Sequence, residues 1–189
     1  EEDKIITALF EEGLDILHLR KPDTAPMYAE RLLTLIPEQY HKRIVVHGHF
    51  YLKEEFHLKG IHLNHRNPQK PYRYKGHTSC SCHSLEEVKE KKHQHDYVFL
   101  SPVFDSISKQ NYKSSYSDVE LKNAHKAGII DKRVIALGGI DINNIKEVKN
   151  HGFGGAAVLG ALWNKFDLCD THDFSDLIEH FKKLKKLAD

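Results

Sequence analysis

Residues 134–160 read VIALGGIDINNIKEVKNHGFGGAAVLG, and this stretch contains the pattern that decides the fold. A short apolar run, 134–137, is followed by Gly138 and Gly139, then by a helical pattern that ends at Gly152 and by a second apolar run. Two short apolar strands joined by a helix are typical of parallel strands that helices cover. The stretch therefore predicts a β-α-β unit, with Asp141 as the cap of its helix.

The same alternation extends over the whole chain, which begins in a helical pattern that Gly13 ends. Strands are expected at 15–20, 43–47, 60–64, 78–82, 96–104, 133–139 and 154–162. Helices are expected at 26–35, 50–58, from 84 onward, at 118–126, 141–152 and 173–187. Their predicted apolar faces comprise Ile5, Ile6, Leu9 and Phe10, then Tyr28, Leu32, Leu33 and Leu35, and finally Phe181 and Leu184.

The positions of the glycines separate two α/β folds. A doubly wound sheet places a G-x-G-x-x-G turn after its first strand, and this chain has none there. Its glycines gather instead at the last two strands, where a barrel binds phosphate on backbone N–H groups. We therefore expect a TIM (β/α)8 barrel whose first strand is missing from this chain, formed as a single domain over residues 1–189.

Composition excludes several classes of protein. The chain has 28 Lys and Arg against 27 Asp and Glu, so nothing favours nucleic acid or an acidic membrane as a partner. No window is apolar enough to span a bilayer, and the first residues lack the pattern of a secretory signal. Three cysteines without a framework spacing favour a reducing compartment. A cytoplasmic protein is expected.

The segment TSCSCHSLEE, residues 78–87, looks like a set of metal ligands. In a strand its two cysteines, Cys80 and Cys82, share one face at roughly 7 Å, which is too far for a disulfide. We expect both to be inert apolar packing groups. Ser84 and Glu87 have the spacing of a capping box and so mark the start of the next helix.

Polar side chains at strand ends are the candidate site residues. His18 and Arg20 share a face of one strand, His47 ends the next, and His62 lies in the third. The Arg20 guanidinium suits a phosphate, bound in a fork, and a structural ion pair is the alternative. No pair has the H-x-x-x-H or C-x-x-C spacing that brings ligands together, so we expect no zinc site.

Two glycine-rich or hydroxyl-rich loops complete the candidates. Ser106, Ser108 and Lys109 follow a strand and suit an oxyanion or an ordinary surface loop. Gly138 and Gly139 allow a backbone to approach a ligand closely, or to make a tight turn without one.

In order along the chain, the motifs HLR, VVHG, GIHLN, SCSCHSLEE, DYVFLSPVF with SISK, VIALGGI and GFGGAAVLGAL resemble the thiamine phosphate synthase and TenI family. The resemblance covers nearly all of the chain and implies a TIM barrel. It implies a transferase of thiamine biosynthesis, which joins hydroxymethylpyrimidine diphosphate to thiazole phosphate and releases pyrophosphate. Mg²⁺ on the diphosphate and cationic side chains would stabilise the departing charge.

The resemblance also assigns residues to this reaction. Its catalytic positions are Arg20, Lys109, His47 and Ser81, and its substrate-binding positions are His18, Arg20, Ser81, Ser106, Ser108, Lys109, Gly138, Gly139, Leu159 and Gly160. Ser81 would face the barrel interior, which leaves the two cysteines on the outside. The ligands would be small phosphorylated thiazoles and pyrimidines, and a homodimer is one possible assembly because barrel relatives often pair.

The sequence departs from the family at the expected metal positions. The two Mg²⁺ carboxylates are replaced by Gly48 and Asn67, so no protein metal ligand is assigned, and Mg²⁺ is expected only with retained synthase activity. The TenI-type thiazole tautomerase histidine is replaced by Pro102. Two alternatives therefore stay open: a tautomerase that uses His47, His62 or His83, and a non-catalytic binder of thiazole or thiamine phosphate.

Overall fold

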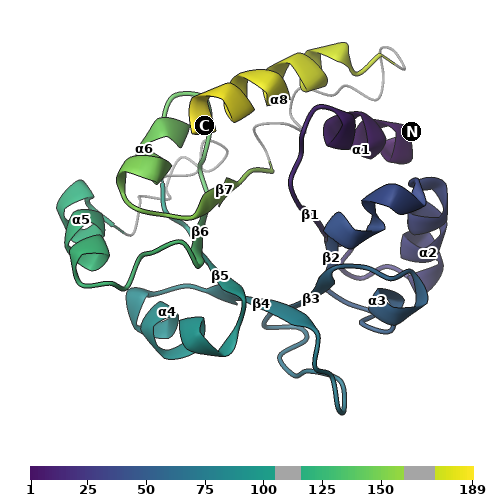
Figure 1. The fold of residues 1–189 in the computed structure, drawn as a ribbon, viewed down its shortest axis with the longest axis horizontal. Coiled ribbons are helices and arrows are strands. Elements are labelled where there is room, and N and C mark those ends of the chain that lie inside the picture. The colour runs from purple at the N-terminus through teal and green to yellow at the C-terminus, as the bar shows by residue number, and fades with distance from the viewer. Residues whose placement is uncertain (105–115, 160–172) are drawn as a thin grey trace. The chain divides into compact units, whose positions relative to one another are not determined.

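The structure, a computed structural model, describes residues 1–104, 116–159 and 173–189. Helices and parallel strands alternate along these residues as predicted (Figure 1). They form two compact units, residues 1–79 and 80–189, with the boundary inside strand β4. The prediction that 1–189 act as one domain stays a prediction.

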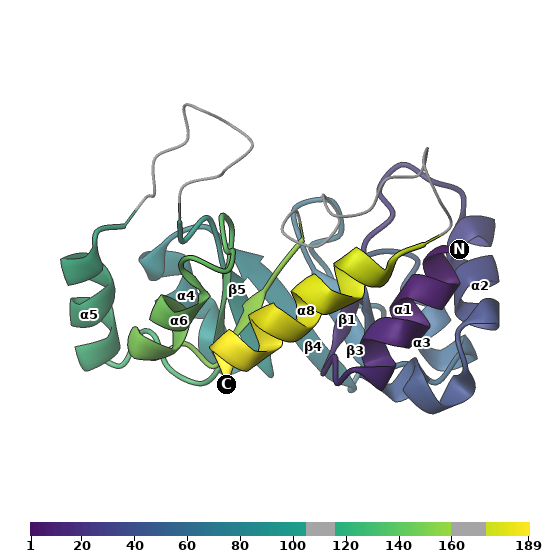
Figure 2. The same ribbon diagram turned by 90° about the horizontal axis from the view of Figure 1, so that it is seen from above.

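The first unit contains three complete strands and their covering helices. In chain order these are α1 (Glu2–Glu11), β1 (Leu17–Leu19), α2 (Pro26–Leu35), the 3-10 helix η1 (Glu38–Arg43), β2 (Ile44–Val46), α3 (Leu52–Glu55) and β3 (Gly60–Leu63). β1 pairs in parallel with β2, and β2 with β3. Helices α1 and α2 lie side by side in both views (Figures 1 and 2).

The second unit continues the same pattern after β4 (His77–Cys82). Its elements are α4 (Leu85–Lys91), the 3-10 helix η2 (Lys92–Gln94), β5 (Tyr97–Leu100), α5 (Asp118–Lys126), β6 (Val134–Leu137), α6 (Ile145–Asn150), β7 (Gly155–Ala157) and α8 (Ser175–Ala188). β5 pairs in parallel with β6, and β6 with β7. Helix α8 packs beside α6.

Strand order distinguishes the two folds that the sequence left in competition. Within each unit, hydrogen-bonded neighbours are also neighbours in the sequence. A doubly wound sheet reverses its strand order near the middle, whereas a barrel keeps sequential order throughout. The seven strands of the described residues therefore have the topology of the barrel.

Buried apolar side chains confirm two of the predicted helix faces and correct a third. Ile5, Ile6, Leu9 and Phe10 are all buried, as are Phe181 and Leu184 of α8. On α2, however, Tyr28 is 62% exposed and Leu35 is 54% exposed. The core face comprises Ala29, Leu32, Leu33 and Ile36, whose spacing i, i+3, i+4, i+7 matches the helical period, and the other two lie one residue off it.

Helix starts follow the predicted capping chemistry in one case and depart from it in another. The Ser84 hydroxyl accepts a hydrogen bond from the Glu87 backbone N–H, as the capping box requires. The prediction that Asp141 caps α6 is wrong, because the N-cap residue is Asn144. Asp141 instead accepts from the Asn143 N–H at 2.8 Å and closes the turn before the helix. Its side chain bonds two residues ahead, as in an Asx turn.

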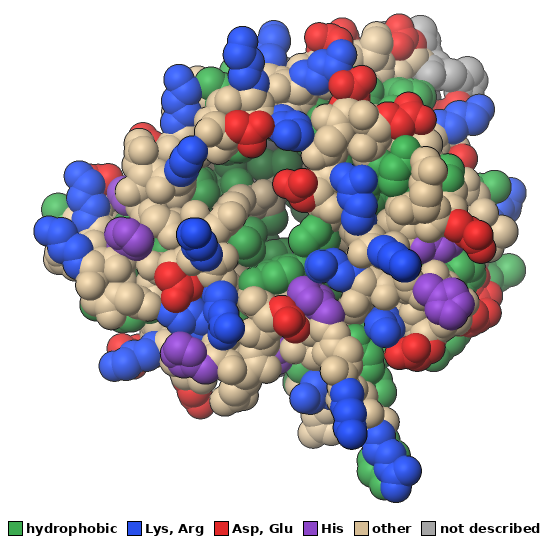
Figure 3. Space-filling model, in the orientation of Figure 1, with side chains coloured by type: hydrophobic (Ala, Val, Ile, Leu, Met, Phe, Trp, Pro, Cys, Tyr) green, Lys and Arg blue, Asp and Glu red, His purple; other side chains and the backbone are tan. Residues whose placement is uncertain are grey.

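Surface charge agrees with the balanced composition. On the face drawn in Figure 3, Lys and Arg side chains are interspersed with Asp and Glu. Among the described residues, no helix is both long and apolar enough to cross a membrane.

Lys92 is a buried cation that holds the end of α5 in the second unit. Its ammonium donates to the carbonyls of Gly128 at 2.6 Å and Ile129 at 3.1 Å, and to the Asp131 carboxylate at 2.8 Å. These three acceptors match the three donors of an ammonium. The side chain thus satisfies carbonyls that follow the last turn of the helix.

Replacing Lys92 by methionine is expected to lower the free energy of unfolding by about 2 kcal/mol, because apolar volume is kept while charged hydrogen bonds are lost. Asp131 is 44% exposed, so water compensates part of the loss. Urea denaturation measures the effect, and Lys89→Met on the exposed face of α4 is the matched control. Equal changes in the two variants would show that the buried bonds contribute nothing.

Candidate functional site

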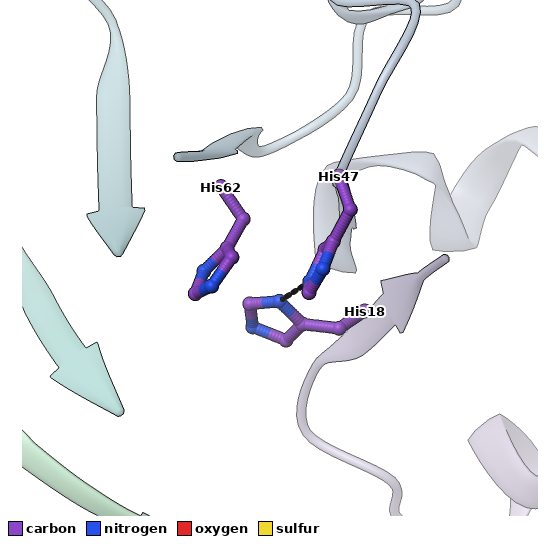
Figure 4. Close-up of side chains that lie close together, drawn as sticks. All are labelled: His18, His47 and His62. Atoms are coloured by element: carbon purple, nitrogen blue, oxygen red, sulfur yellow. Dashed lines mark hydrogen bonds between the residues drawn. The ribbon is translucent and has the colours of Figure 1, made fainter. Parts of the chain in front are cut away.

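Three histidines from successive strands of the first unit converge in space. His18 lies in β1, His47 directly follows β2, and His62 lies in β3. Val46 is in register with Ile61, so the next residues along these parallel strands, His47 and His62, also lie level. One ligand nitrogen from each of the three rings lies within 4.8 Å of the others (Figure 4).

The rings pack in an ordered arrangement. His47 and His62 stack with centroids 4.1 Å apart and an interplanar angle of 15°. His18 meets both of them edge-on, at 87° and 89°. His18 Nδ1 and His47 Nε2 are 2.9 Å apart and share a hydrogen bond, while His62 Nδ1 bonds to the Ser79 hydroxyl at 2.7 Å.

Burial keeps two of these imidazoles neutral. It holds the pKa of His18 well below its usual value, with a further contribution from His47. It also lowers the pKa of His47 to about 4, assisted by the positive charge of Arg20. At neutral pH both rings therefore carry a lone pair that can accept a proton or bind a cation.

A cleft of about 340 Å³ lies beside the cluster in the same unit. Its lining includes His47, Arg20, Lys21, Asp23, Thr24, Gly48, His49, Arg66 and Asn67. Lys21 pairs with Glu2 at 2.7 Å, and Arg66 pairs with Asp23 at 2.7 Å. Arg20 is exposed and forms no ion pair with any described residue, so its guanidinium is available to an anion.

Two asparagines fix the backbone around this cleft. Asn64 donates from Nδ2 to the carbonyls of His47 at 3.0 Å and His62 at 3.2 Å. Asn67, at a position where the family resemblance implies a carboxylate, donates to the same His47 carbonyl at 3.1 Å. A Cβ on Gly48, the other such position, would approach Asn67 Nδ2 no closer than 3.5 Å. A Cβ at this position therefore causes no steric overlap.

The remaining predicted residues lie in the second unit or outside the described residues. Ser81 is half-buried in β4, and Leu159 is 62% exposed after β7. Gly138 and Gly139 have φ of 100° and 66°, the conformations that glycine permits. The Asn144 amide donates to the Gly139 carbonyl at 2.7 Å and closes this turn. Ser106, Ser108, Lys109 and Gly160 lie outside the described residues.

The structure thus brings together His18, Arg20 and His47 of the predicted set. The convergence of His62 with them was not predicted, because the usual ligand spacings apply within one helix or strand. The sequence signal for this cluster is one histidine at a similar level in each of three successive parallel strands, in HLR, VVHG and GIHL.

Cys80 and Cys82 are free and buried, at 4% and 0% exposure. A hydrogen bond from Cys82, and contributions from His95, lower the pKa of the Cys80 thiol to about 5. The same bond raises the pKa of Cys82. A thiolate reacts only where a reagent reaches it, so burial is expected to keep both thiols unreactive in the folded protein.

Iodoacetamide is expected to leave the peptide with Cys80 and Cys82 unmodified in the folded protein and to alkylate it fully in urea. Peptide mapping by mass spectrometry separates this peptide from Cys169, which lies outside the described residues. Alkylation of the folded protein at the rate seen in urea would contradict the inert role.

Comparisons with known proteins identify the family of the chain. Residues 1–162 match the family of thiamine monophosphate synthase, TMP-TENI. The thiamine-phosphate synthase of Latilactobacillus sakei is 28% identical over 142 residues, which are 71% of this chain and 62% of that protein. The chain thus spans less than two thirds of the length of this curated relative.

Two solved structures are similar in fold. Thiamine phosphate pyrophosphorylase from Bacteroides thetaiotaomicron is 66% identical, with a TM-score of 0.93 over 100% of this chain and 91% of that one. The corresponding protein from Pyrococcus furiosus is 18% identical, with a TM-score of 0.76 over 100% and 89%, and shows the fold alone. These likenesses confirm the predicted α/β barrel class, and the seven described strands agree with a barrel that lacks one strand.

The order of motifs, the sequential parallel strands and these similarities lead to one conclusion: the chain belongs to the thiamine monophosphate synthase family.

Proposed function

We propose that this protein is a transferase that forms thiamine phosphate from hydroxymethylpyrimidine diphosphate and thiazole phosphate. The C–O bond to the diphosphate breaks, pyrophosphate leaves with the electron pair, and the thiazole nitrogen forms the new C–N bond. The observation that carries the proposal is Arg20, an exposed guanidinium that pairs with no described residue and lines the cleft of a chain 66% identical to a thiamine phosphate pyrophosphorylase.

The cleft provides the charge that such a leaving group requires. Arg20, Lys21 and Arg66 all line it. Cations aimed at a departing diphosphate stabilise the charge that develops in the transition state. In this proposal Arg20 binds the diphosphate in a bidentate manner, and His18 and His47 contact the pyrimidine. Gly138 and Gly139 bind the thiazole phosphate through backbone N–H groups, a role supported by the family motif and their positive φ.

The residues present do not fit a Mg²⁺ ion held by protein carboxylates. Asp23 is the only carboxylate that lines the cleft among the described residues, and it is paired with Arg66. The two positions that the family resemblance assigns to Mg²⁺ ligands are Gly48 and Asn67, which carry no negative charge. Mg²⁺ prefers anionic oxygen, so no step of the reaction is assigned to it here.

The direct test is to incubate the purified protein with both substrates and to measure thiamine phosphate and pyrophosphate, with Mg²⁺ and with a chelator. Equal amounts of the two products are expected, and none when either substrate is omitted. Absence of product while thiazole phosphate still raises the thermal unfolding temperature would overturn the synthase and support a non-catalytic binder.

Restoring one carboxylate should change the metal dependence. Gly48→Asp is expected to lower the Mg²⁺ concentration for half-maximal activity by about 10-fold, since a charged ligand contributes about 1.4 kcal/mol or more. The new Cβ would make only an ordinary contact, 3.5 Å from Asn67 Nδ2. Gly48→Asn, of equal size and no charge, is the matched control. If both variants respond to Mg²⁺ alike, the position does not contact the ion.

A second candidate function rests on the half-buried imidazole of His47, whose pKa is lowered to about 4. Such a ring can shuttle a proton on a thiazole, as a tautomerase requires. His83, the other candidate base outside the cluster, is exposed and bonds to the Ser101 carbonyl at 3.3 Å. Exchange of thiazole protons that survives loss of His47, His62 and His83 together would exclude this function.

The proposed function also implies a class of ligand and a cellular location. We propose small phosphorylated thiazoles and pyrimidines as ligands, on the basis of family membership. A cytoplasmic location is supported by three cysteines without a disulfide framework, two of which are free and buried.

A further inference from the structure

The histidine cluster places three polar rings among buried apolar residues of the strands. The residues beside its members are apolar, among them Leu19, Val46 and Ile61, which are 7%, 1% and 0% exposed. His62 itself is fully buried. His18 and His47 are half-buried. Polar groups in such surroundings need hydrogen-bond partners, and these rings find them in each other and in Ser79. The three imidazoles thus form one polar cluster within an apolar environment.

The geometry points to a metal ion: we propose that His18, His47 and His62 bind one divalent transition-metal ion of the Zn²⁺ class. Their ligand nitrogens lie within 4.8 Å of one another, and His18 Nδ1 and His47 Nε2 are already 2.9 Å apart. Zn–N bonds of about 2.0–2.1 Å in a tetrahedral site place nitrogens about 3.3 Å apart. Binding of the ion would require the rings to rotate until the more distant nitrogens reach this spacing.

The surroundings of the rings are those of metal-binding histidines. Ser79 Oγ lies 2.7 Å from His62 Nδ1, so with Nε2 on a metal the Nδ1–H donates to this hydroxyl. Such outer partners fix the tautomer and the orientation of a ligating ring. Asn64 bonds the backbone carbonyls of both His47 and His62 and holds these two ligands relative to each other.

Ligand chemistry selects the class of ion. Imidazole suits Zn²⁺, Co²⁺, Ni²⁺ and Fe²⁺, whereas Mg²⁺ requires oxygen ligands. The proposed site is therefore different from the Mg²⁺ site that the family resemblance implies, and it does not depend on the proposed synthase reaction. His47 also lines the cleft, so the fourth position of the ion would face water or an anion that enters there.

Metal binding is measured directly on the full chain, without an affinity tag and without substrates. Zn²⁺ is titrated calorimetrically into protein treated with a chelator, and Co²⁺ is added separately to record the visible bands of a tetrahedral ion. One equivalent of each ion is expected. Failure to bind one equivalent of either ion would overturn the proposal, whether or not the protein forms thiamine phosphate.

Variants then assign the site. His47→Gln should weaken Zn²⁺ binding by more than about 100-fold, since a lost ligand matters more than the 10–100-fold typical of outer partners. Ser79→Ala should weaken it by about 10-fold and leave the Co²⁺ bands in place. His93 is an exposed histidine of η2, so His93→Gln is the control and should leave the Zn²⁺ affinity and the Co²⁺ bands unchanged.

Circular dichroism confirms that each variant is folded, and Ser79→Ala retains all three ligands should His47→Gln be unstable. Zn²⁺ affinity unchanged in both cluster variants, or lowered as much by His93→Gln, would show that the ion binds elsewhere among the 15 histidines of the chain and would overturn the proposal.

Discussion

Arg20→Ala is expected to lower kcat/KM for thiamine phosphate formation by about 10²–10³-fold, the usual effect of removing one group that stabilises developing charge. Arg20 is the exposed guanidinium of the cleft that pairs with no described residue, so its loss removes a contact to substrate and breaks no ion pair among them. Arg20→Lys should recover only part of the activity, because an ammonium lacks the planar fork.

Steady-state kinetics with varied pyrimidine diphosphate give this measurement. Arg31→Ala is the matched control, since Arg31 is an exposed arginine of α2 that does not line the cleft. The unfolding midpoint in urea should be the same for the variants and the wild type. If kcat/KM falls equally in Arg20→Ala and Arg31→Ala, the diphosphate is bound elsewhere.

Gly138→Ala should lower the free energy of unfolding by about 3 kcal/mol, which combines the strain of positive φ with a steric overlap. The new Cβ would lie 2.8 Å from Pro102 Cα and 2.9 Å from Pro102 Cβ, against backbone that cannot rotate away. The loop is then expected to shift, and affinity for thiazole phosphate should fall with it.

Gly128→Ala separates the strain of positive φ from the steric overlap. Gly128 has φ of 78°, yet a Cβ there would have no atom within 4 Å. This variant carries the backbone strain alone and should lose only about 1 kcal/mol. Chemical denaturation of both variants measures the difference. Equal losses would show that Pro102 gives way and that the turn at Gly138 is not tightly packed.

The sequence predicted the order of elements because short apolar runs and glycine stops are local signals. The predicted range of α5, roughly 118–126, agrees with the structure, and the apolar stripe of α1 is buried as expected. Strands came out shorter than predicted: β1 covers Leu17–Leu19 rather than 15–20, since pairing with β2 extends over only three residues. Helix α3 covers only Leu52–Glu55, and His57 beyond it adopts a φ of 55°.

Predictions for the site depended on whether its geometry was local. Gly138 and Gly139 were identified from their own conformational freedom, and both have positive φ. The histidine cluster was missed because its members are 29 and 15 residues apart, and only the parallel register of three strands makes them neighbours. The prediction for α2 was wrong at Tyr28 and Leu35 because these two were assigned to the apolar face, whereas the helical period selects Ala29 and Ile36.

The hydrogen bond from Asn67 to the His47 carbonyl limits which residues position 67 accepts. An aspartate there would set a carboxylate oxygen where an amide N–H now lies 3.1 Å from a carbonyl oxygen, and two acceptors repel. Asn67→Asp would thus weaken the loop before any ion could compensate. At Gly48, by contrast, a new Cβ would make only an ordinary contact with Asn67 Nδ2 at 3.5 Å, so the two positions differ in their tolerance of a carboxylate, and their effects are expected to be epistatic because the two residues adjoin.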